Sequence, residues 1–135
     1  MAQTITRGYK AMVADANAAI ETVPAKDAVS LHGRDDVVLV DLRDPRELER
    51  EGRIPGAFHC PRGMLEFWID PASPYFRKEF GEAKRYVFHC ALDWRSALST
   101  QTAQRMGLEN VMHLKGGFKA WKEVGGPVEK VSKSA

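Results

Sequence analysis

The fold of this chain is decided by one short stretch, Tyr86-Val87-Phe88-His89-Cys90-Ala91-Leu92-Asp93-Trp94-Arg95-Ser96. Apolar residues lead into Cys90, and an amphipathic, helix-like segment follows Arg95. A loop at the start of a helix leaves backbone N–H groups without partners at the positive end of the helix dipole. Such groups favour an anion, which here is the thiolate of the cysteine. The stretch therefore predicts a nucleophilic cysteine at a strand–loop–helix junction.

Apolar patterns on both sides of this stretch predict strands that alternate with helices. The expected strands cover residues 37–40, 57–59, 85–89 and 110–114. The expected helices cover residues 8–23, 25–33, 45–51, 64–68, 74–80, 95–106 and 117–123. This alternation predicts an α/β domain with a mostly parallel central sheet. In such sheets ligands bind outside the carboxyl ends of the strands, and Cys90 follows one of those ends.

Length and composition exclude several classes of protein. The chain has 135 residues, so we expect one domain over residues 1–135, with an N-terminal helical extension over 1–24 and a flexible tail over 129–135. The hydrophobic fraction of 44% and charged fraction of 28% are ordinary for a soluble globular protein. A net charge of +2 without a basic stripe argues against nucleic-acid binding. No apolar run approaches the roughly 20 residues that a membrane span needs.

The two cysteines, Cys60 and Cys90, are interpreted as reduced. Residues 1–7 lack the apolar segment of a secretory signal, so we expect a cytoplasmic protein in which a structural disulfide is disfavoured. A metal site is not expected, because the chain has no paired-cysteine spacing and its four histidines are scattered. We interpret Cys60 as a small buried residue. The alternative is a thiol that forms a disulfide with Cys90 under oxidation.

Four ordered motifs resemble those of the rhodanese (sulfurtransferase) family. They are Val38–Arg43 followed by Glu47, the turn Gly52–Ala57, the six-residue loop Cys90–Arg95, and the terminal block Asn110–Trp121. The similarity runs from about residue 25 to residue 128, and four motifs in order are far more specific than one. The resemblance implies a three-layer α/β/α domain with about five strands in its sheet.

The resemblance also implies an activity, which is the transfer of sulfane sulfur through a persulfide on Cys90. The thiolate would attack a small donor such as thiosulfate, and cyanide, a thiol or an acceptor protein would then remove the sulfur. The loop amides would stabilise the negative charge as an oxyanion hole does. These substrate-binding residues are Ala91, Leu92, Asp93, Trp94 and Ser96. Neither a metal nor an organic cofactor is required.

Other residues of the motifs receive supporting roles. Arg95 is expected to orient the loop or to bind an anionic substrate in a bidentate manner. We favour a helix-capping role for Ser96 over a catalytic one. Asp41 and Arg43 are interpreted as structural supports, with Asp41 accepting hydrogen bonds from the loop and Arg43 paired with Glu47 four residues on.

Three departures from the family pattern bear on the site. Asp93 stands where the family often has glycine; aspartate tolerates a left-handed backbone, but its carboxylate disfavours a nearby anion. No loop residue except Arg95 is cationic, which weakens the case for thiosulfate as the physiological donor. Arg53 replaces the usual histidine of the turn. It either brings positive charge to the site or is a plain surface residue, and both interpretations stay open.

Two side chains beside the nucleophile are harder to place. Trp94 either lies exposed at the rim of the pocket or folds onto neighbouring helices, and the sequence does not decide between them. His89 directly precedes Cys90 and is interpreted as a packing histidine, because adjacent strand residues point to opposite faces.

Two other functions are alternatives to sulfur transfer. One is a non-catalytic module that carries persulfide or binds another protein, although retention of Cys90 and Arg95 argues against an inactive copy. The other is a cysteine phosphatase or arsenate reductase of related fold. The related phosphatases place five residues between cysteine and arginine, whereas this chain has four. The shorter loop suits a sulfur atom better than a phosphate.

Overall fold

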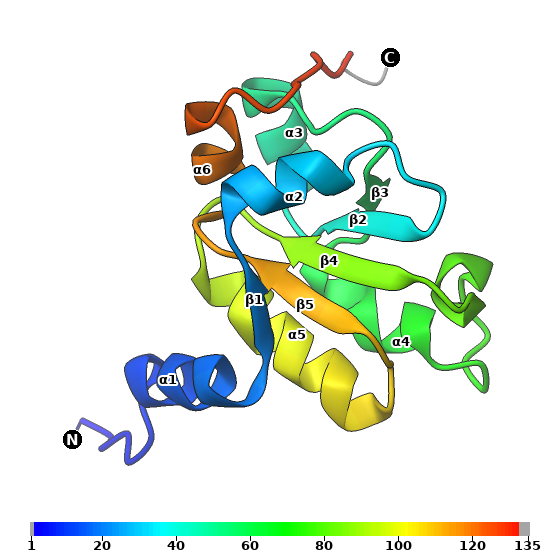
Figure 1. The fold of residues 1–135 in the computed structure, drawn as a ribbon. Helices are drawn as coiled ribbons and strands as arrows, with labels where there is room; N and C mark the ends of the chain where they lie inside the picture. Colours follow the sequence, from blue (N-terminus) through cyan, green and yellow to red (C-terminus); the bar gives the residue numbers. More distant parts are fainter. Residues whose placement is uncertain (1, 133–135) are drawn as a thin grey trace.

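Figure 1 shows a twisted central sheet with helices on both faces, in a computed structural model that describes residues 2–132. The strands are β1 (Glu21–Val23), β2 (Val37–Asp41), β3 (Phe58–His59), β4 (Arg85–His89) and β5 (Val111–Leu114). They lie in the order β1-β5-β4-β2-β3, and every neighbouring pair is parallel. The predicted α/β class and five-stranded parallel sheet are confirmed.

In the described part of the chain, six α-helices cover this sheet. They are α1 (Tyr9–Ala19), α2 (Ala25–Leu31), α3 (Pro45–Glu51), α4 (Leu65–Ile69), α5 (Trp94–Met106) and α6 (Gly117–Glu123). Short 3₁₀ helices occur at Arg62–Met64 and Lys78–Gly81. In Figure 1, α2, α3 and α6 lie above the sheet, and α1, α4 and α5 lie below it. This is the three-layer α/β/α arrangement that the family resemblance implied.

Both faces of the sheet are buried, because successive strand residues point to opposite sides. One core cluster contains Leu39, Val87 and Met112 from the strands, with Ala28 from α2 and Trp121 from α6. The other contains the neighbouring strand residues Val40, Phe88 and Val111, with Leu65 from α4 and Ala103 from α5. Helices therefore pack against both faces of the strands, and the carboxyl ends of the strands lie together at one edge of the sheet.

The predicted helix over residues 8–23 is wrong in its last turn. Helix α1 ends at Ala19, and Glu21–Val23 form β1, which pairs in parallel with β5. The β-branched residues Thr22 and Val23 favour an extended backbone, and the pairing with β5 satisfies their backbone groups. This edge strand raises the strand count to the expected five.

Two further expectations are corrected. Of the helix predicted over residues 74–80, only the 3₁₀ turn Lys78–Gly81 forms. Glu129, expected in a flexible tail, is paired with Arg53 by two backbone hydrogen bonds of 2.9 Å. Residues 133–135 of that predicted tail lie outside the described residues. No helix within residues 2–132 combines the length and apolar character that crossing a membrane would require.

Candidate active site

Cys90 directly follows β4 at the carboxyl edge of the sheet, and α5 begins four residues later at Trp94. The segment Cys90–Arg95, called the active loop below, lines a cavity of about 330 Å³. Cys90 is only 2% exposed, and it is one of the residues that line this cavity. The structure thus brings together Cys90 and the loop residues that the sequence singled out.

The carbonyl groups of Cys90 and Ala91 in the active loop accept hydrogen bonds from α6. Phe118 N donates to Cys90 O at 2.8 Å, and Lys119 N donates to Ala91 O at 3.2 Å. Within residues 2–132, by contrast, no backbone carbonyl accepts a hydrogen bond from the amides of residues 91–93. Those N–H groups, at the start of a thirteen-residue helix, therefore remain available to an anion in the cavity.

A glycine pair after β5 lets α6 approach the active loop this closely. Gly117 has φ +60°, and a Cβ atom there would lie 2.5 Å from Cys90 O and 2.8 Å from Ala91 C. Gly116 N donates to Asp93 Oδ1 at 2.7 Å. The sequence indicated only a turn at these glycines. The structure shows that this turn and the start of α6 bind the active loop by hydrogen bonds.

Arg95 is held beside the cavity by a carboxylate far away in the sequence. Its two terminal nitrogens donate to Glu47 Oε1 and Oε2 at 2.7 and 3.0 Å. The hydrogen bond to Glu47 raises the pKa of Arg95, with a smaller contribution from Cys90. The same bond lowers the pKa of Glu47. The predicted pair between Arg43 and Glu47 is wrong, because Glu47 instead fixes the orientation of Arg95.

Asp41 and Arg43 form a buried ion pair at the end of β2. Arg43 donates through Nε and a terminal nitrogen to both Asp41 oxygens, at 2.9 and 2.7 Å. Its guanidinium also lies 4.2 Å from the centre of the Phe118 ring in α6. The expectation that Asp41 accepts hydrogen bonds from the active loop is wrong, because within residues 2–132 its carboxylate oxygens accept from Arg43. Asp41 supports the site indirectly, through Arg43 and the helix that binds the loop.

His89 completes this buried group from the neighbouring strand. It is fully buried, with Nε2 3.3 Å from Asp41 Oδ2. Burial alone would raise the pKa of Asp41, but its contacts with His89 and Arg43 outweigh burial, so the pKa lies well below its ordinary range. The interpretation of His89 as a packing residue rather than a base for Cys90 agrees with this placement.

Ser96 was expected to cap α5, but it does not. The N-cap position belongs to Asp93, whose side chain makes no capping bond. Ser96 Oγ instead lies 3.5 Å from Cys90 Sγ and donates to Asp93 O at 3.1 Å. Asp93 also has φ −133°, so the left-handed backbone considered for it is absent.

The structure gives the contacts of Trp94 and Arg53, whose roles the sequence left open. Trp94 is 59% exposed at the rim of the active-loop cavity, and its ring centre lies 4.7 Å from that of Tyr9 in α1. Arg53 pairs with Glu129 at 3.0 Å and does not line the cavity. Arg53 is therefore not placed to supply positive charge to the site.

Cys60 is fully buried, as interpreted from the sequence, and both cysteines are free thiols in this structure. Burial raises the pKa of Cys60 to about 12, so this thiol is kept protonated. Within residues 2–132, no group of three or more histidine, cysteine or acidic side chains is arranged to hold a metal ion.

A family model for the rhodanese-like domain matches residues 24–124. The chain belongs to the rhodanese-like family. The matched region includes the active loop and the glycine pair, while α1 precedes it. The family assignment therefore agrees with the placement of Cys90 on this fold.

Individual relatives cover most of the chain. A structure of a protein of unknown function from Rhodopseudomonas palustris, named a possible tyrosine phosphatase, is 60% identical with a TM-score of 0.93, over 96% of this chain and 99% of that one. An uncharacterized protein of Synechocystis is 33% identical over 81% of this chain, which spans 56% of that protein's length. A sulfurtransferase of Allochromatium vinosum is 30% identical over 70% of this chain and 79% of that protein.

Proposed function

We propose that the protein is a rhodanese-type sulfurtransferase, which moves sulfane sulfur from a donor such as thiosulfate to cyanide or a thiol. The proposal depends on the surroundings of Cys90. Cys90 lines a cavity formed by its own six-residue loop, and the amides of residues 91–93 have no backbone acceptor in the described part of the chain. Such a cradle stabilises a negatively charged sulfur.

The reaction proceeds in two steps through this loop. The Cys90 thiolate attacks the outer sulfur of thiosulfate, a new S–S bond forms, and sulfite leaves with the electron pair of the bond that breaks. The acceptor then attacks the outer sulfur of the persulfide and releases the thiolate. The loop amides stabilise the negative charge in both steps, and Arg95, fixed by Glu47, orients an anionic donor.

A cysteine phosphatase is the second candidate, because the Rhodopseudomonas relative is named a possible tyrosine phosphatase. Four residues separate Cys90 from Arg95, one fewer than in the related phosphatases. The shorter loop favours a sulfur atom. Incubation with p-nitrophenyl phosphate distinguishes the two: we expect no Cys90-dependent release of nitrophenol, and turnover that Cys90→Ser abolishes would favour the phosphatase.

The main test of sulfur transfer is the formation of thiocyanate from thiosulfate and cyanide. We expect turnover by the native protein and none by Cys90→Ser, because serine is a far weaker nucleophile than a thiolate. Cys60→Ala is the matched control and keeps the activity, since Cys60 is buried away from the active-loop cavity.

The outcomes of this test separate the remaining alternatives. Turnover that survives in Cys90→Ser would contradict the proposal. A native protein that takes up sulfur on Cys90 but passes none to cyanide would be a persulfide carrier. A Cys90 that takes up no sulfur would leave only a protein-binding module.

A further inference from the structure

Behind the active loop, three buried side chains form a continuous row. Cys90 Sγ lies 3.5 Å from Ser96 Oγ, and Ser96 Oγ lies 3.1 Å from Nδ1 of His113 on β5. Ser96 is fully buried and His113 is 2% exposed. The row joins β4, α5 and β5, so no short-range sequence pattern could have revealed it.

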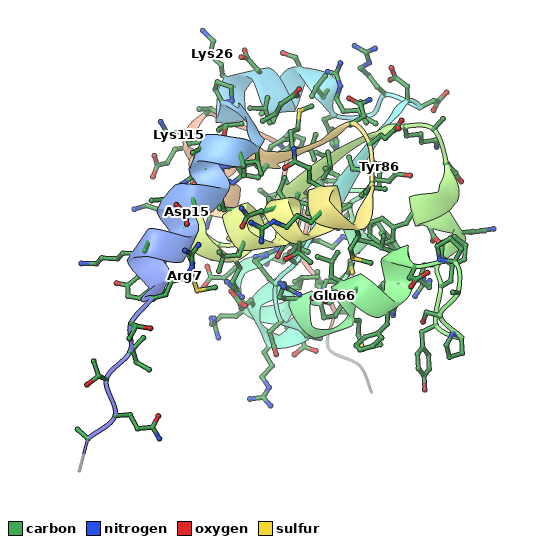
Figure 2. The ribbon with its side chains drawn as sticks, turned by 90° about the horizontal axis from the view of Figure 1, so that it is seen from below. Arg7, Asp15, Lys26, Glu66, Tyr86 and Lys115 are labelled. Atoms are coloured by element: carbon green, nitrogen blue, oxygen red, sulfur yellow. The ribbon has the colours of Figure 1, made fainter. Side chains whose placement is uncertain are left out.

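His113 also lines a second cavity, called the rear cavity below, which shares Asp93 and Trp94 with the active-loop cavity. This rear cavity measures about 490 Å³ and is lined by Val13, Asn17, Thr22, Asp93, Trp94, His113 and Lys115. Figure 2 shows Lys115 beside α1, which supplies Val13 and Asn17. His113 therefore both contacts Ser96 and lines the rear cavity, and it does not belong to the active loop.

The surroundings of His113 contain few charges. Thr22 and Phe88 are its partners on the neighbouring strands β1 and β4, and neither titrates. Helix α1 contributes Val13 and Asn17 to the rear cavity, which also do not titrate. The charged groups that act on His113 are Asp93 from the active loop and Lys115 after β5.

These surroundings keep His113 neutral. Burial lowers the pKa of His113; the carboxylate of Asp93 raises it, Lys115 lowers it, and the net shift is downwards from the ordinary 6.5. A neutral imidazole has one unprotonated ring nitrogen, which accepts a proton. With the proton on Nε2, that acceptor is Nδ1, the nitrogen beside Ser96.

We propose that His113 is a positioning residue that receives the thiol proton of Cys90 through Ser96 and releases it to water in the rear cavity. The inference rests on the proposed function. The S–H bond of Cys90 breaks, its electron pair stays on sulfur, and its proton binds Ser96 Oγ. The hydroxyl of Ser96, which donates to Asp93 O at 3.1 Å before the transfer, turns towards Nδ1 of His113 and gives up its proton there. The Nε2 proton then passes to water, which leaves a neutral imidazole.

Such a route serves the proposed chemistry because the front of Cys90 is occupied when a donor binds. Cys90 is 2% exposed and lines the active-loop cavity, so an anion bound in that cavity keeps water away from the sulfur. A proton acceptor behind the sulfur forms the thiolate without displacing the donor. General acid–base groups of this kind act through at most one bridging group, as Ser96 does here.

The test measures the alkylation of Cys90 by iodoacetamide between pH 5 and pH 9, with the modified cysteine located by peptide mass. His113→Asn keeps a hydrogen-bonding group near Nδ1 but takes up no proton, and Ser96→Ala removes the bridge. We expect each variant to react about tenfold more slowly than the native protein near pH 7 and to recover at high pH, where hydroxide removes the proton. Ser99→Ala, on the same helix and also buried, is the matched control and keeps the native profile.

The double variant gives the decisive comparison. Because His113 and Ser96 act in series, Ser96→Ala with His113→Asn is expected to react no more slowly than either single variant. A loss that is equal at every pH, or additive losses in the double variant, would overturn the proposal and indicate a purely structural role.

The experiment does not depend on sulfur transfer. If the native protein forms no thiocyanate yet the alkylation profiles shift as expected, the proposed function fails and the proton route stands. If turnover is normal and the His113→Asn profile coincides with the native one, the route fails and the function stands.

Discussion

Asp93 is the residue whose charge is least suited to an anionic donor. Its carboxylate lies in the active loop, yet Oδ1 accepts a 2.7 Å hydrogen bond from Gly116 N. Asp93→Asn keeps an oxygen for that bond and removes the charge. We expect kcat/KM for thiosulfate to rise by about threefold to tenfold, because the Asp93 carboxylate repels an anionic donor at this partly exposed site.

The salt dependence of Asp93→Asn separates charge from shape. We expect the increase in kcat/KM over the native protein to be largest at low ionic strength. It should shrink at about 1 M salt, where the screening length is about 3 Å. Asp93→Glu, which keeps the charge, serves as the control and shows no gain. Equal rates for the native protein and Asp93→Asn at low salt would remove the idea that this carboxylate repels the donor.

At the scale of an element, α6 and the active loop depend on the backbone of Gly117. A Cβ atom there would lie 2.5 Å from Cys90 O, and φ is +60°. Gly117→Ala is therefore expected to displace the loop, abolish thiocyanate formation and lower the free energy of unfolding by about 2–4 kcal/mol, since strain and overpacking add. Thermal unfolding and turnover measure the two effects.

Gly125→Ala is the matched control for this change. Gly125 also has a positive φ, +81°, but a Cβ atom there meets nothing within 4 Å. We expect it to lose only about 1 kcal/mol, the cost of the left-handed backbone for alanine, with turnover unchanged. Comparable losses of activity in the two variants would show that contact with the active loop is not the cause.

The sequence predicts those elements whose signals are local. Asp44 and Pro45 mark the start of α3, and the structure shows the expected cap, with Asp44 accepting from Arg46 N at 2.8 Å. The strand β4 and the start of α5 follow in the same way from the stretch around Cys90. By contrast, Glu21–Val23 continue a helical apolar pattern, and only pairing with β5 makes them a strand.

The same distinction applies to the candidate site. The active loop is one continuous segment, so its residues are recognised together. Contacts between distant segments cannot be recognised in this way. The ion pair of Arg95 with Glu47 and the contact of Ser96 with His113 depend on the topology of the sheet. Sequence spacing paired Glu47 with Arg43, because side chains four residues apart are neighbours on a helix.

At the scale of the whole molecule, the buried group of Asp41, Arg43 and His89 links the stability of the fold to pH. The pKa of Asp41 is lowered from 3.8, so the unfolded chain binds a proton at a higher pH than the folded one. This contribution to the free energy of unfolding is complete above pH 3.8 and is lost as the pH falls further. We expect a slope of about 1.4 kcal/mol per pH unit from this one carboxyl group below that pH.

Urea unfolding at several values of pH measures this slope. The double variant Asp41→Asn with Arg43→Met removes both charges of the buried pair, which often leaves stability nearly unchanged at neutral pH. Its slope below pH 3.8 is expected to be smaller than the native slope by the contribution of one proton. Parallel curves for the two proteins would contradict the assignment of this acid sensitivity to Asp41.

The intact mass of the protein tests most directly whether sulfur rests on Cys90 between donor and acceptor. After incubation with thiosulfate, the account predicts a gain of about 32 Da, one sulfur atom, which cyanide removes and which Cys90→Ser does not show. An unchanged mass, or a gain that persists in Cys90→Ser, would contradict the account.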